Sequence, residues 1–255
     1  MTDLVFFAVA YNPEENLFQN VIRAKSEGYR VCVYLNRVSS KDLNRLQDLE
    51  VELLGENTNV GLGIAFFELE KMLLSEGKAR YIYFDQDTIV ESETLSIIKN
   101  RSANDLVGQG AIFYTSDKVT SYRSGFVPSS GCLFHISEPE LMHDRELYVE
   151  CVDYEYCIRL KTNRQPLKVI SIPGIDHCSL QDGASISLFG RVFYYRVYPA
   201  SRVLDFNRSH FKLLKMVLCS LDLRSFFFLT RSLVLFNVNN VKSKLFEVFK
   251  CSFQS

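Results

Sequence analysis

The chain has 255 residues, of which 47% are hydrophobic and 23% charged, and its formal net charge is −1. This is the composition of a globular protein with one large core and an appendage, and it gives no reason to expect a nucleic-acid partner. No hydrophobic run approaches the ~20 residues that span a bilayer and no basic segment precedes the first run, so we expect neither a transmembrane helix nor a signal peptide.

Three hydrophobic runs of strand length open the chain and alternate with segments of helical periodicity. The strands are expected at residues 4–10, 30–35 and 51–54. The first helix follows Tyr11, with Asn12 as its N-cap and Pro13 in its first turn, and the second begins at Ser40. This alternation predicts a parallel sheet with crossover helices.

A glycine-containing loop and a pair of acids come next. Asn59 and Gly61 lie in the loop of residues 57–65, where glycines permit positive φ and close approach to a ligand, or simply begin the following helix. The strand at residues 81–84 then runs directly into Asp85 and Asp87. Ligands bind at the carboxyl ends of such strands, and carboxylates one residue apart can converge on Mg²⁺ or Mn²⁺. The simpler interpretation is a polar turn.

The middle of the chain continues the α/β pattern. We expect a helix over residues 91–100, a strand over 105–114, a surface loop over 115–128 and a late strand over 167–172. Ser130 and Gly131 form a turn into a strand at residues 132–134. A helix over residues 150–160 carries Asp153 and Glu155 near its start, where the helix dipole alone would also favour acids. His177 follows the last strand, a position where a hydrogen-bonded turn histidine is the simpler interpretation.

The last segment differs from the rest in charge. From Ala200 onward there are nine lysines and arginines against three acids, a balance of +6, whereas residues 1–199 hold 20 and 27, a balance of −7. Its hydrophobic residues keep helical spacing, with a break expected at Asn239-Asn240. Basic amphipathic helices suit a membrane interface, and they also suit a cap packed on the sheet or on a partner subunit. We therefore predict a domain over residues 1–199 and a basic, Phe-rich helical extension over 200–255 that contacts a membrane surface or another copy in a homodimer.

The order of these motifs resembles the family 2 glycosyltransferases with a GT-A fold, especially the bacterial rhamnosyltransferase-like branch, over roughly residues 4–210. Six features carry the resemblance, namely a strand ending in Tyr11-Asn12, the loop Asn59-x-Gly61-x-Gly63-x-Ala65, Asp85-Gln86-Asp87, Ser130-Gly131-Cys132-Leu133, Asp153-x-Glu155-x-x-x-Arg159, and His177. Each is weak alone, but six in this order are specific. The resemblance implies an α/β fold whose mixed, mainly parallel sheet is flanked by helices, with a C-terminal helical extension.

The resemblance also implies a metal-dependent, inverting transfer of a sugar from a nucleotide-diphosphate donor. Asp85, Asp87 and His177 would hold Mn²⁺ or Mg²⁺, and Asp153 would act as general base on the acceptor hydroxyl. The implied donor-binding residues are Tyr11, Asn12, Asn36, Asn59, Gly61, Asp85 and Asp87. The implied acceptor-side or supporting residues are Ser130, Gly131, Glu155 and Arg159.

The implied partners are a dTDP- or UDP-linked sugar donor and a saccharide acceptor linked to polyprenyl diphosphate, in bacterial O-antigen or capsule synthesis. This places the protein in the cytoplasm, at the cytoplasmic face of the inner membrane. The 7 cysteines are odd in number and include no Cys-x-x-Cys, which also favours reduced thiols in a cytosolic protein.

Two departures from the family pattern bear on the donor. Leu35, just before Asn36, stands where many members carry a nucleotide-contacting Asp, and Phe66-Phe67 stands where an Asn often follows Ala65. The first departure motivates an alternative, a non-catalytic sugar-nucleotide-binding component of a polysaccharide assembly complex, which the intact acids oppose. A nucleotidyltransferase would be expected to carry an early glycine-rich phosphate loop, which residues 9–15 lack.

Overall fold

The computed structural model describes residues 4–77, 80–105, 110–122, 125–177, 184–188, 191–195 and 198–253. The chain separates into two compact units, Met1–Cys178 and Ser179–Ser255, and each unit is described by itself.

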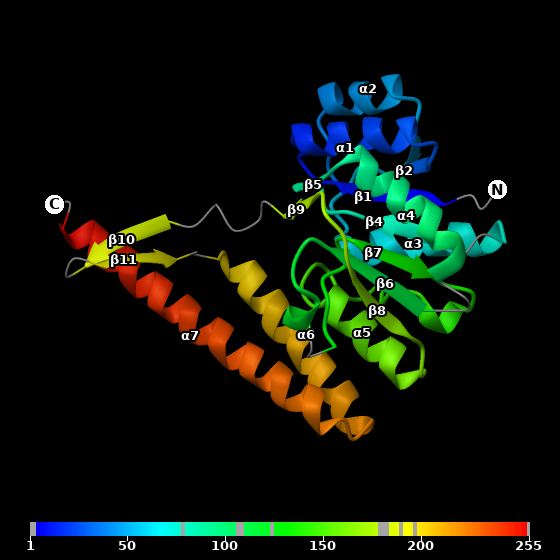
Figure 1. Ribbon diagram of the computed structural model, residues 1–255. Coiled ribbons are helices and arrows are strands. Elements are labelled where there is room, and N and C mark those ends of the chain that lie inside the picture. Colours follow the sequence, from blue (N-terminus) through cyan, green and yellow to red (C-terminus); the bar gives the residue numbers. More distant parts are fainter. Residues whose placement is uncertain are drawn as a thin grey trace. The chain divides into compact units, whose positions relative to one another are not determined.

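The first unit is built on a seven-stranded sheet with the strand order β3-β2-β1-β4-β7-β6-β8 (Figure 1). The strands are β1 (Val5–Ala10), β2 (Arg30–Leu35), β3 (Glu52–Leu54), β4 (Arg80–Tyr83), β6 (Gly110–Thr115), β7 (Cys132–His135) and β8 (Leu167–Ser171). Only β7 runs antiparallel to its neighbours, β4 and β6, and the other pairs of this sheet are parallel. The expected mixed, mainly parallel sheet is therefore confirmed.

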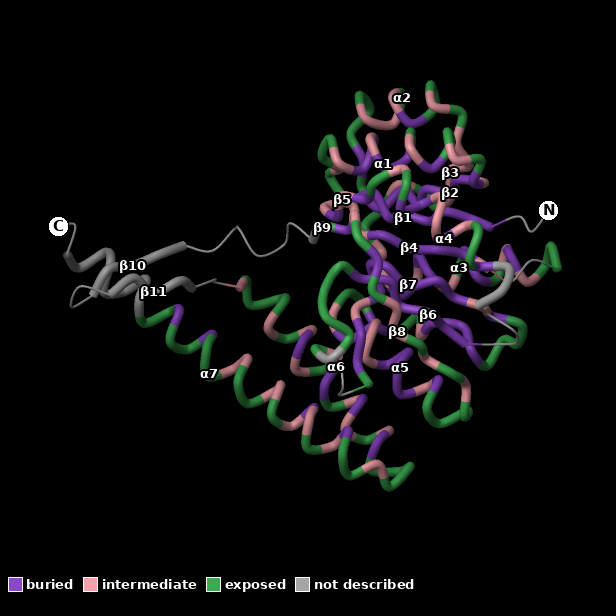
Figure 2. Tube along the Cα trace, in the orientation of Figure 1, coloured by how far each residue is buried: buried purple, intermediate pink, exposed green. Residues whose placement is uncertain are grey.

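Helices cover both faces of this sheet because alternate strand residues point to opposite sides. On one face, Phe6 and Ala8 of β1 pack with α1 (Glu15–Ser26), α2 (Ser40–Asp48) and α4 (Ser92–Asp105) in one hydrophobic cluster. On the other face, Phe7 packs edge-on against Phe66 of α3 (Leu62–Ser75), with ring centroids 5.6 Å apart. The α5 helix (Val152–Thr162) covers this second face through Tyr156. The strands β1, β2, β4, β6 and β7 are consequently buried along nearly their whole length, whereas β3 and β8 at the two ends of the strand order are partly exposed (Figure 2).

The carboxyl ends of β1, β2 and β4 meet at one edge of the sheet, and the expected site residues follow these ends. Tyr11 follows β1, Asn36 follows β2 and Asp85 lies just beyond β4. Because β7 is antiparallel, its amino end reaches the same edge, which brings Ser130 and Gly131 there too. A small antiparallel pair joins β5 (Thr88–Val90), which directly follows the acids in the chain, to β9 (Ile175–His177).

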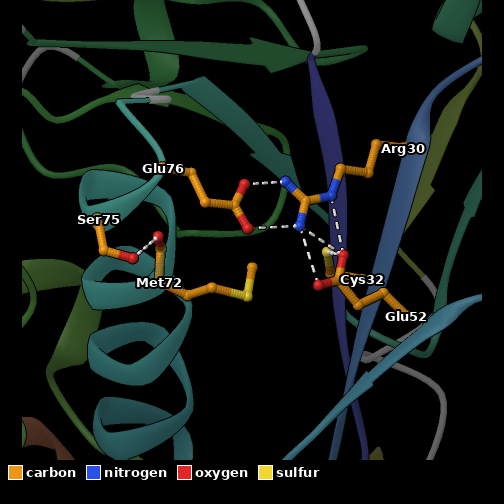
Figure 3. Close-up of polar contacts among 6 residues, drawn as sticks. All are labelled: Arg30, Cys32, Glu52, Met72, Ser75 and Glu76. Carbon is orange, nitrogen blue, oxygen red and sulfur yellow. Dashed lines mark hydrogen bonds and ion pairs between the residues drawn. The ribbon is translucent and has the colours of Figure 1, made fainter.

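The opposite edge of the sheet is held by a cluster of charges around Arg30, the first residue of β2 (Figure 3). The Arg30 guanidinium donates to both oxygens of Glu52 at 2.8 and 2.9 Å, and to Glu76 at 3.0 Å. The Cys32 thiol donates to the same Glu52 carboxylate at 3.2 Å. Hydrogen bonds to Glu76 and Glu52 raise the pKa of Arg30 above its usual range. The cluster ties β2, β3 and the end of α3 together, away from the acids after β4.

Two local expectations are wrong. Asn12 has φ 42°, and its N–H donates to the Arg37 carbonyl at 3.1 Å, so α1 begins later, at Glu15, with Glu14 as its N-cap. Asp105 ends α4 instead of opening a strand, and β6 begins at Gly110. The surface loop predicted over residues 115–128 begins with the last residue of β6 and carries one short 3-10 helix, Val119–Tyr122.

The second unit contains a β-hairpin and two helices. The hairpin pairs β10 (Ala184–Leu188) with β11 (Arg191–Tyr195), and the helices are α6 (Ala200–Cys219) and α7 (Leu223–Phe253). The break expected at Asn239-Asn240 is wrong, because α7 continues through both residues and Asn240 is buried. None of the helices in the described ranges is long and hydrophobic enough to cross a membrane.

Candidate active site at the carboxyl edge of the sheet

The turn that carries Asp85 and Asp87 is held in place by Ser130. The Thr88 N–H donates to the Asp85 carbonyl at 3.1 Å, which closes the turn. The Asp85 N–H donates to the Ser130 hydroxyl at 3.0 Å, and the Thr88 and Ser130 hydroxyl oxygens lie 2.8 Å apart. Ser130 is buried and its neighbour Gly131 donates its N–H to the Tyr83 carbonyl at 2.8 Å. The residues expected on the acceptor side therefore support the turn of the two acids.

Tyr83, a residue that we did not single out in the sequence, orients Asp85. Its hydroxyl donates to Asp85 Oδ1 at 2.6 Å. Burial, and then the negative charge of Asp85, raise the pKa of Tyr83 well above its usual value, so the phenol stays protonated and donates. Asp85 and Asp87, both half-buried, thus lie together at the edge of the sheet. Because Tyr83 lies within a hydrophobic strand, its pattern alone did not indicate this contact.

Gln86, between the two acids, joins their turn to the end of β1. Its side-chain oxygen accepts from the Tyr11 N–H at 2.9 Å, and its side-chain nitrogen donates to the Tyr11 carbonyl at 2.8 Å. Tyr11 is therefore held next to the turn that carries Asp85 and Asp87. Asn12 stands beside this contact in its left-handed conformation.

Asn36, expected at the donor, is buried and binds the glycine loop. Its side-chain oxygen accepts from the Val60 N–H at 2.8 Å. Asn57 binds the backbone of Val38 in a similar way, through its side-chain oxygen and nitrogen. Asn59 is exposed on this loop. The structure therefore gives Asn36 a role in loop positioning that does not depend on a donor.

The glycines of this loop are needed because another part of the chain lies against them. A Cβ on Gly61, which has φ 87°, would lie 2.4 Å from the carbonyl oxygen of Tyr148. A Cβ on Gly63 would lie 2.2 Å from the carbonyl oxygen of Leu147. Real side chains do not tolerate such contacts with backbone. The close approach expected for a ligand is thus made by the segment that leads into α5.

Asp153 lies in the first turn of α5, after Cys151 in a left-handed conformation with φ 66°. Asp153 is half-buried, and the burial of its carboxyl group raises the pKa of that group to about 7. The negative charges of Asp85 and Glu150 raise the pKa further, whereas the Tyr154 N–H, which donates to Asp153 Oδ1 at 2.9 Å, opposes the change. A carboxyl that titrates near neutrality suits a general base. The contribution of Asp85 places the turn after β4 and the start of α5 in one electrostatic environment.

The raised pKa makes a prediction about stability. We expect Asp153→Asn to raise the free energy of unfolding at pH 8 and to change this free energy little at pH 4. The usual pKa of 3.8 applies in the unfolded chain and about 7 in the folded chain, so the folded chain holds the extra proton between these values. The free energy of unfolding therefore falls as the pH rises through this window, and Asn removes the effect. Melting temperatures at pH 4, 6 and 8 measure it, with the exposed Asp48→Asn as control. A difference from the parent chain that is equal at every pH would contradict the assignment.

Glu155 and Arg159 bind each other instead of Asp153. Glu155 is buried, and its Oε1 pairs with the Arg159 guanidinium one helical turn later. Burial raises the pKa of Glu155, and the Arg159 charge opposes this rise. Arg159 also donates to the Glu140 carbonyl at 3.0 Å. Arg159 therefore supports α5 through Glu155 and through the Glu140 carbonyl.

His177 is placed only by its backbone, because its side chain lies outside the described part. The backbone of His177 pairs with that of Thr88 in the β5–β9 ladder, and Thr88 directly follows Asp87 in the chain. Among the residues with described side chains, no group of three His, Cys, Asp or Glu is arranged to hold a metal. Asp85 and Asp87 alone still fit Mg²⁺ or Mn²⁺, because such ions are commonly bound by one or two carboxylates together with substrate phosphates.

A second polar cluster, which we did not predict, lies beneath this site. The Glu70 carboxylate accepts from the His143 N–H at 2.6 Å and also binds the His143 ring and the Tyr81 hydroxyl. The His143 ring is stacked between Phe66 and Tyr156, with centroids 4.2 and 4.3 Å away. The cluster joins α3, β4 and α5 within the core.

Comparison with known proteins gives one curated relative and several solved structures. No protein-family model matches the chain. The dTDP-rhamnosyl transferase RfbF of Shigella flexneri is 27% identical over 179 residues, which cover 59% of this chain and 60% of that protein. The chain thus spans about 60% of the length of the curated relative that it matches.

The solved structures support the fold. Residues 1–349 of S. aureus TarS match with a TM-score of 0.53 and 14% identity, over 85% of this chain and 65% of that one. TarS 1–349 in complex with UDP-GlcNAc matches with a TM-score of 0.51 and 13% identity, over 85% and 66%. Glucosyl-3-phosphoglycerate synthase from Mycobacterium tuberculosis, in complex with Mn²⁺, UDP and phosphoglyceric acid, matches with a TM-score of 0.54 and 11% identity, over 84% and 78%. The solved structures show that the chain has the GT-A fold, and the curated relative supports its resemblance to the family 2 glycosyltransferases.

Proposed function

We propose that this chain is an inverting glycosyltransferase that moves a sugar from a nucleotide-diphosphate donor to a saccharide acceptor. The observation that carries the proposal is that two acids follow β4 at the carboxyl edge of the sheet and that the charge of one of them acts on a third carboxyl, Asp153. Asp85 and Asp87 stand on a turn fixed by Ser130, and the charge of Asp85 helps to raise the pKa of Asp153 to about 7. A diphosphate site and a base of suitable pKa are the two parts that such a transfer needs.

On the donor side, Asp85 and Asp87 would hold Mn²⁺ or Mg²⁺, with His177 as a further ligand. A bound divalent cation would neutralise the negative charge that develops on the leaving diphosphate. The chain's own contribution is to keep the two carboxylates in place, through the Tyr83 hydroxyl on Asp85 and the Gln86 contact with Tyr11. The complex of glucosyl-3-phosphoglycerate synthase with Mn²⁺ and UDP supports this part by fold analogy.

On the acceptor side, Asp153 would take the proton of the attacking hydroxyl as that oxygen bonds to the anomeric carbon and the diphosphate leaves. One displacement of this kind inverts the configuration at the anomeric carbon. Glu155 is buried against Arg159 and supports α5, so it is not our candidate for the base.

The donor is proposed to be dTDP- or UDP-linked. The dTDP form follows the name of the Shigella relative, and the UDP form follows the complexes of the fold neighbours. Tyr11, Asn12 and Asn59 remain the proposed donor contacts, whereas Gly61 would act through the position of its loop, because Tyr148 lies against it. Asn36 would act indirectly, through the loop that it holds. The acceptor is proposed to be a polyprenyl-diphosphate-linked saccharide in O-antigen or capsule synthesis at the cytoplasmic face of the inner membrane.

Release of nucleoside diphosphate tests the proposal. The chain is mixed with Mn²⁺, a polyprenyl-diphosphate-linked N-acetylhexosamine and, in turn, dTDP-rhamnose, UDP-glucose and UDP-N-acetylglucosamine. We expect one donor to raise the melting temperature and to release its nucleoside diphosphate only when the acceptor is present. Binding of a donor, without release over a panel of saccharide acceptors, would favour the non-catalytic alternative.

A further inference from the structure

The α6–α7 helix pair is joined by polar contacts. Asn207 and Asn237 exchange hydrogen bonds between their side-chain amides at 2.8 and 3.3 Å. His210 Nε2 lies 3.2 Å from the Ser232 hydroxyl. Beside these, Phe206 stacks on the ring of Phe236, with centroids 3.6 Å apart. Ser225, Asn240 and Ser243 of α7 are also buried, so polar residues fill much of the inner face of this helix.

The outer face of α7 is hydrophobic, which reverses the usual arrangement of a helix in water. Its side chains are 44–69% exposed and recur at intervals of three, four and seven residues, namely Leu223, Phe227, Val234, Val238, Val241 and Leu245. At 100° per residue they form one stripe about 60° wide. The α6 helix repeats the pattern with Leu204, Phe211 and Leu218, which are 50–69% exposed. We call these nine residues the outer stripes, and Figure 2 shows how exposed positions recur along both helices.

Basic side chains border each stripe. Arg208 and Lys215 are exposed beside the α6 stripe, and Arg231 and Lys242 are exposed beside the α7 stripe. The acids within residues 198–245 are Asp205 and Asp222, and neither is exposed. Hydrophobic stripes bordered by positive charge match a surface that is hydrophobic within and negative at its boundary.

We infer that the outer stripes of α6 and α7 bind the surface of an anionic lipid bilayer, with both helices lying in the plane of its headgroups. Their hydrophobic residues enter the acyl boundary while Arg208, Lys215, Arg231 and Lys242 meet lipid phosphates. A second copy of the chain fits less well, because two copies joined through these stripes would bring their basic borders together. This inference concerns attachment and does not depend on the proposed sugar transfer.

Flotation of the full chain with lipid vesicles tests the inference. We expect the chain to rise with vesicles of phosphatidylcholine and phosphatidylglycerol in a 7:3 ratio, to stay behind with pure phosphatidylcholine, and to be released by 1 M NaCl. Changing Arg208, Lys215, Arg231 and Lys242 to Gln should lower the partition coefficient about 100-fold or more. The matched control changes four exposed basic residues of the first unit to Gln, namely Lys41, Lys71, Arg101 and Lys118. This control should change the partition coefficient less than 3-fold.

A second pair of variants tests the hydrophobic part. Phe227→Ser with Val238→Ser should lower binding to the same vesicles about 10-fold or more, and Ile22→Ser with Val119→Ser, at exposed positions of the first unit, should not. Circular dichroism establishes that each variant is folded. The inference fails if the chain does not bind anionic vesicles, or if folded stripe variants bind as well as the parent. It also fails if sedimentation shows a dimer that Phe227→Ser with Val238→Ser dissociates while no vesicle binding occurs, because a second copy would then cover the stripes.

Discussion

Asp153→Asn is expected to lower kcat at least ~100-fold while the chain still folds and binds its donor. Asn nearly preserves the shape of the side chain but cannot take the acceptor proton, and general base catalysis contributes about 10² to 10⁴-fold. The measurement is the rate of nucleoside diphosphate release under saturating donor and acceptor, with donor affinity from calorimetry. If Asp153→Asn keeps near-normal kcat and Glu155→Gln is inactive although folded, Glu155 is the base.

The pH profile gives an independent readout of the same carboxyl. The pKa of Asp153 is raised to about 7, so below this pH the group is protonated and cannot act as a base. We expect log kcat/KM of the parent chain to rise with a slope near one up to about pH 7 and then to level off. The residual activity of Asp153→Asn should lose this step. A parent profile that is flat from pH 5 to 8 would place the base elsewhere.

Asp87→Ala, or removal of divalent cations, is expected to have the second large effect. Charge stabilisation at a leaving diphosphate is worth several kcal/mol, so we expect kcat/KM to fall at least ~100-fold in either case. EDTA should abolish transfer by the parent chain, and Mn²⁺ or Mg²⁺ should restore it. Neither ion should rescue Asp87→Ala. The control Asp48→Ala removes an exposed acid at the end of α2 and should leave the rate unchanged. Full activity of Asp87→Ala after chelation would remove the metal from the proposal.

The parts of the fold that follow from local pattern were predictable. Hydrophobic runs marked β1, β2 and β4, because strands covered on both faces need hydrophobic residues throughout. The antiparallel direction of β7 was not evident, since its four residues pair with β4 and β6 through backbone groups common to all residues. The continuity of α7 through Asn239-Asn240 was missed for a related reason. Asparagine is a weak helix former, but Asn240 is buried and Ser243 donates to the Asn239 carbonyl at 2.9 Å.

The candidate site was likewise predictable only in part. The motif positions Asp85 and Asp153 could be found from the sequence, and the structure couples their charges. The groups that hold them could not, because Tyr83 and Ser130 act through contacts between distant parts of the chain. Gln86 also illustrates this limit, since only the folded chain shows that the middle residue of the motif binds the backbone of Tyr11.

The contact of Gly61 and Gly63 with residues 147 and 148 has a consequence for protein engineering. One design that this contact constrains is the grafting of residues 57–65 from another transferase. In this chain the Leu62 N–H donates to the Tyr148 carbonyl at 2.5 Å, and neither glycine has room for a Cβ. A grafted loop with different glycine positions would collide with the segment that leads to Asp153 and disturb the base along with the donor site. Exchanges should therefore move residues 57–65 and 144–148 together, as one interchangeable module.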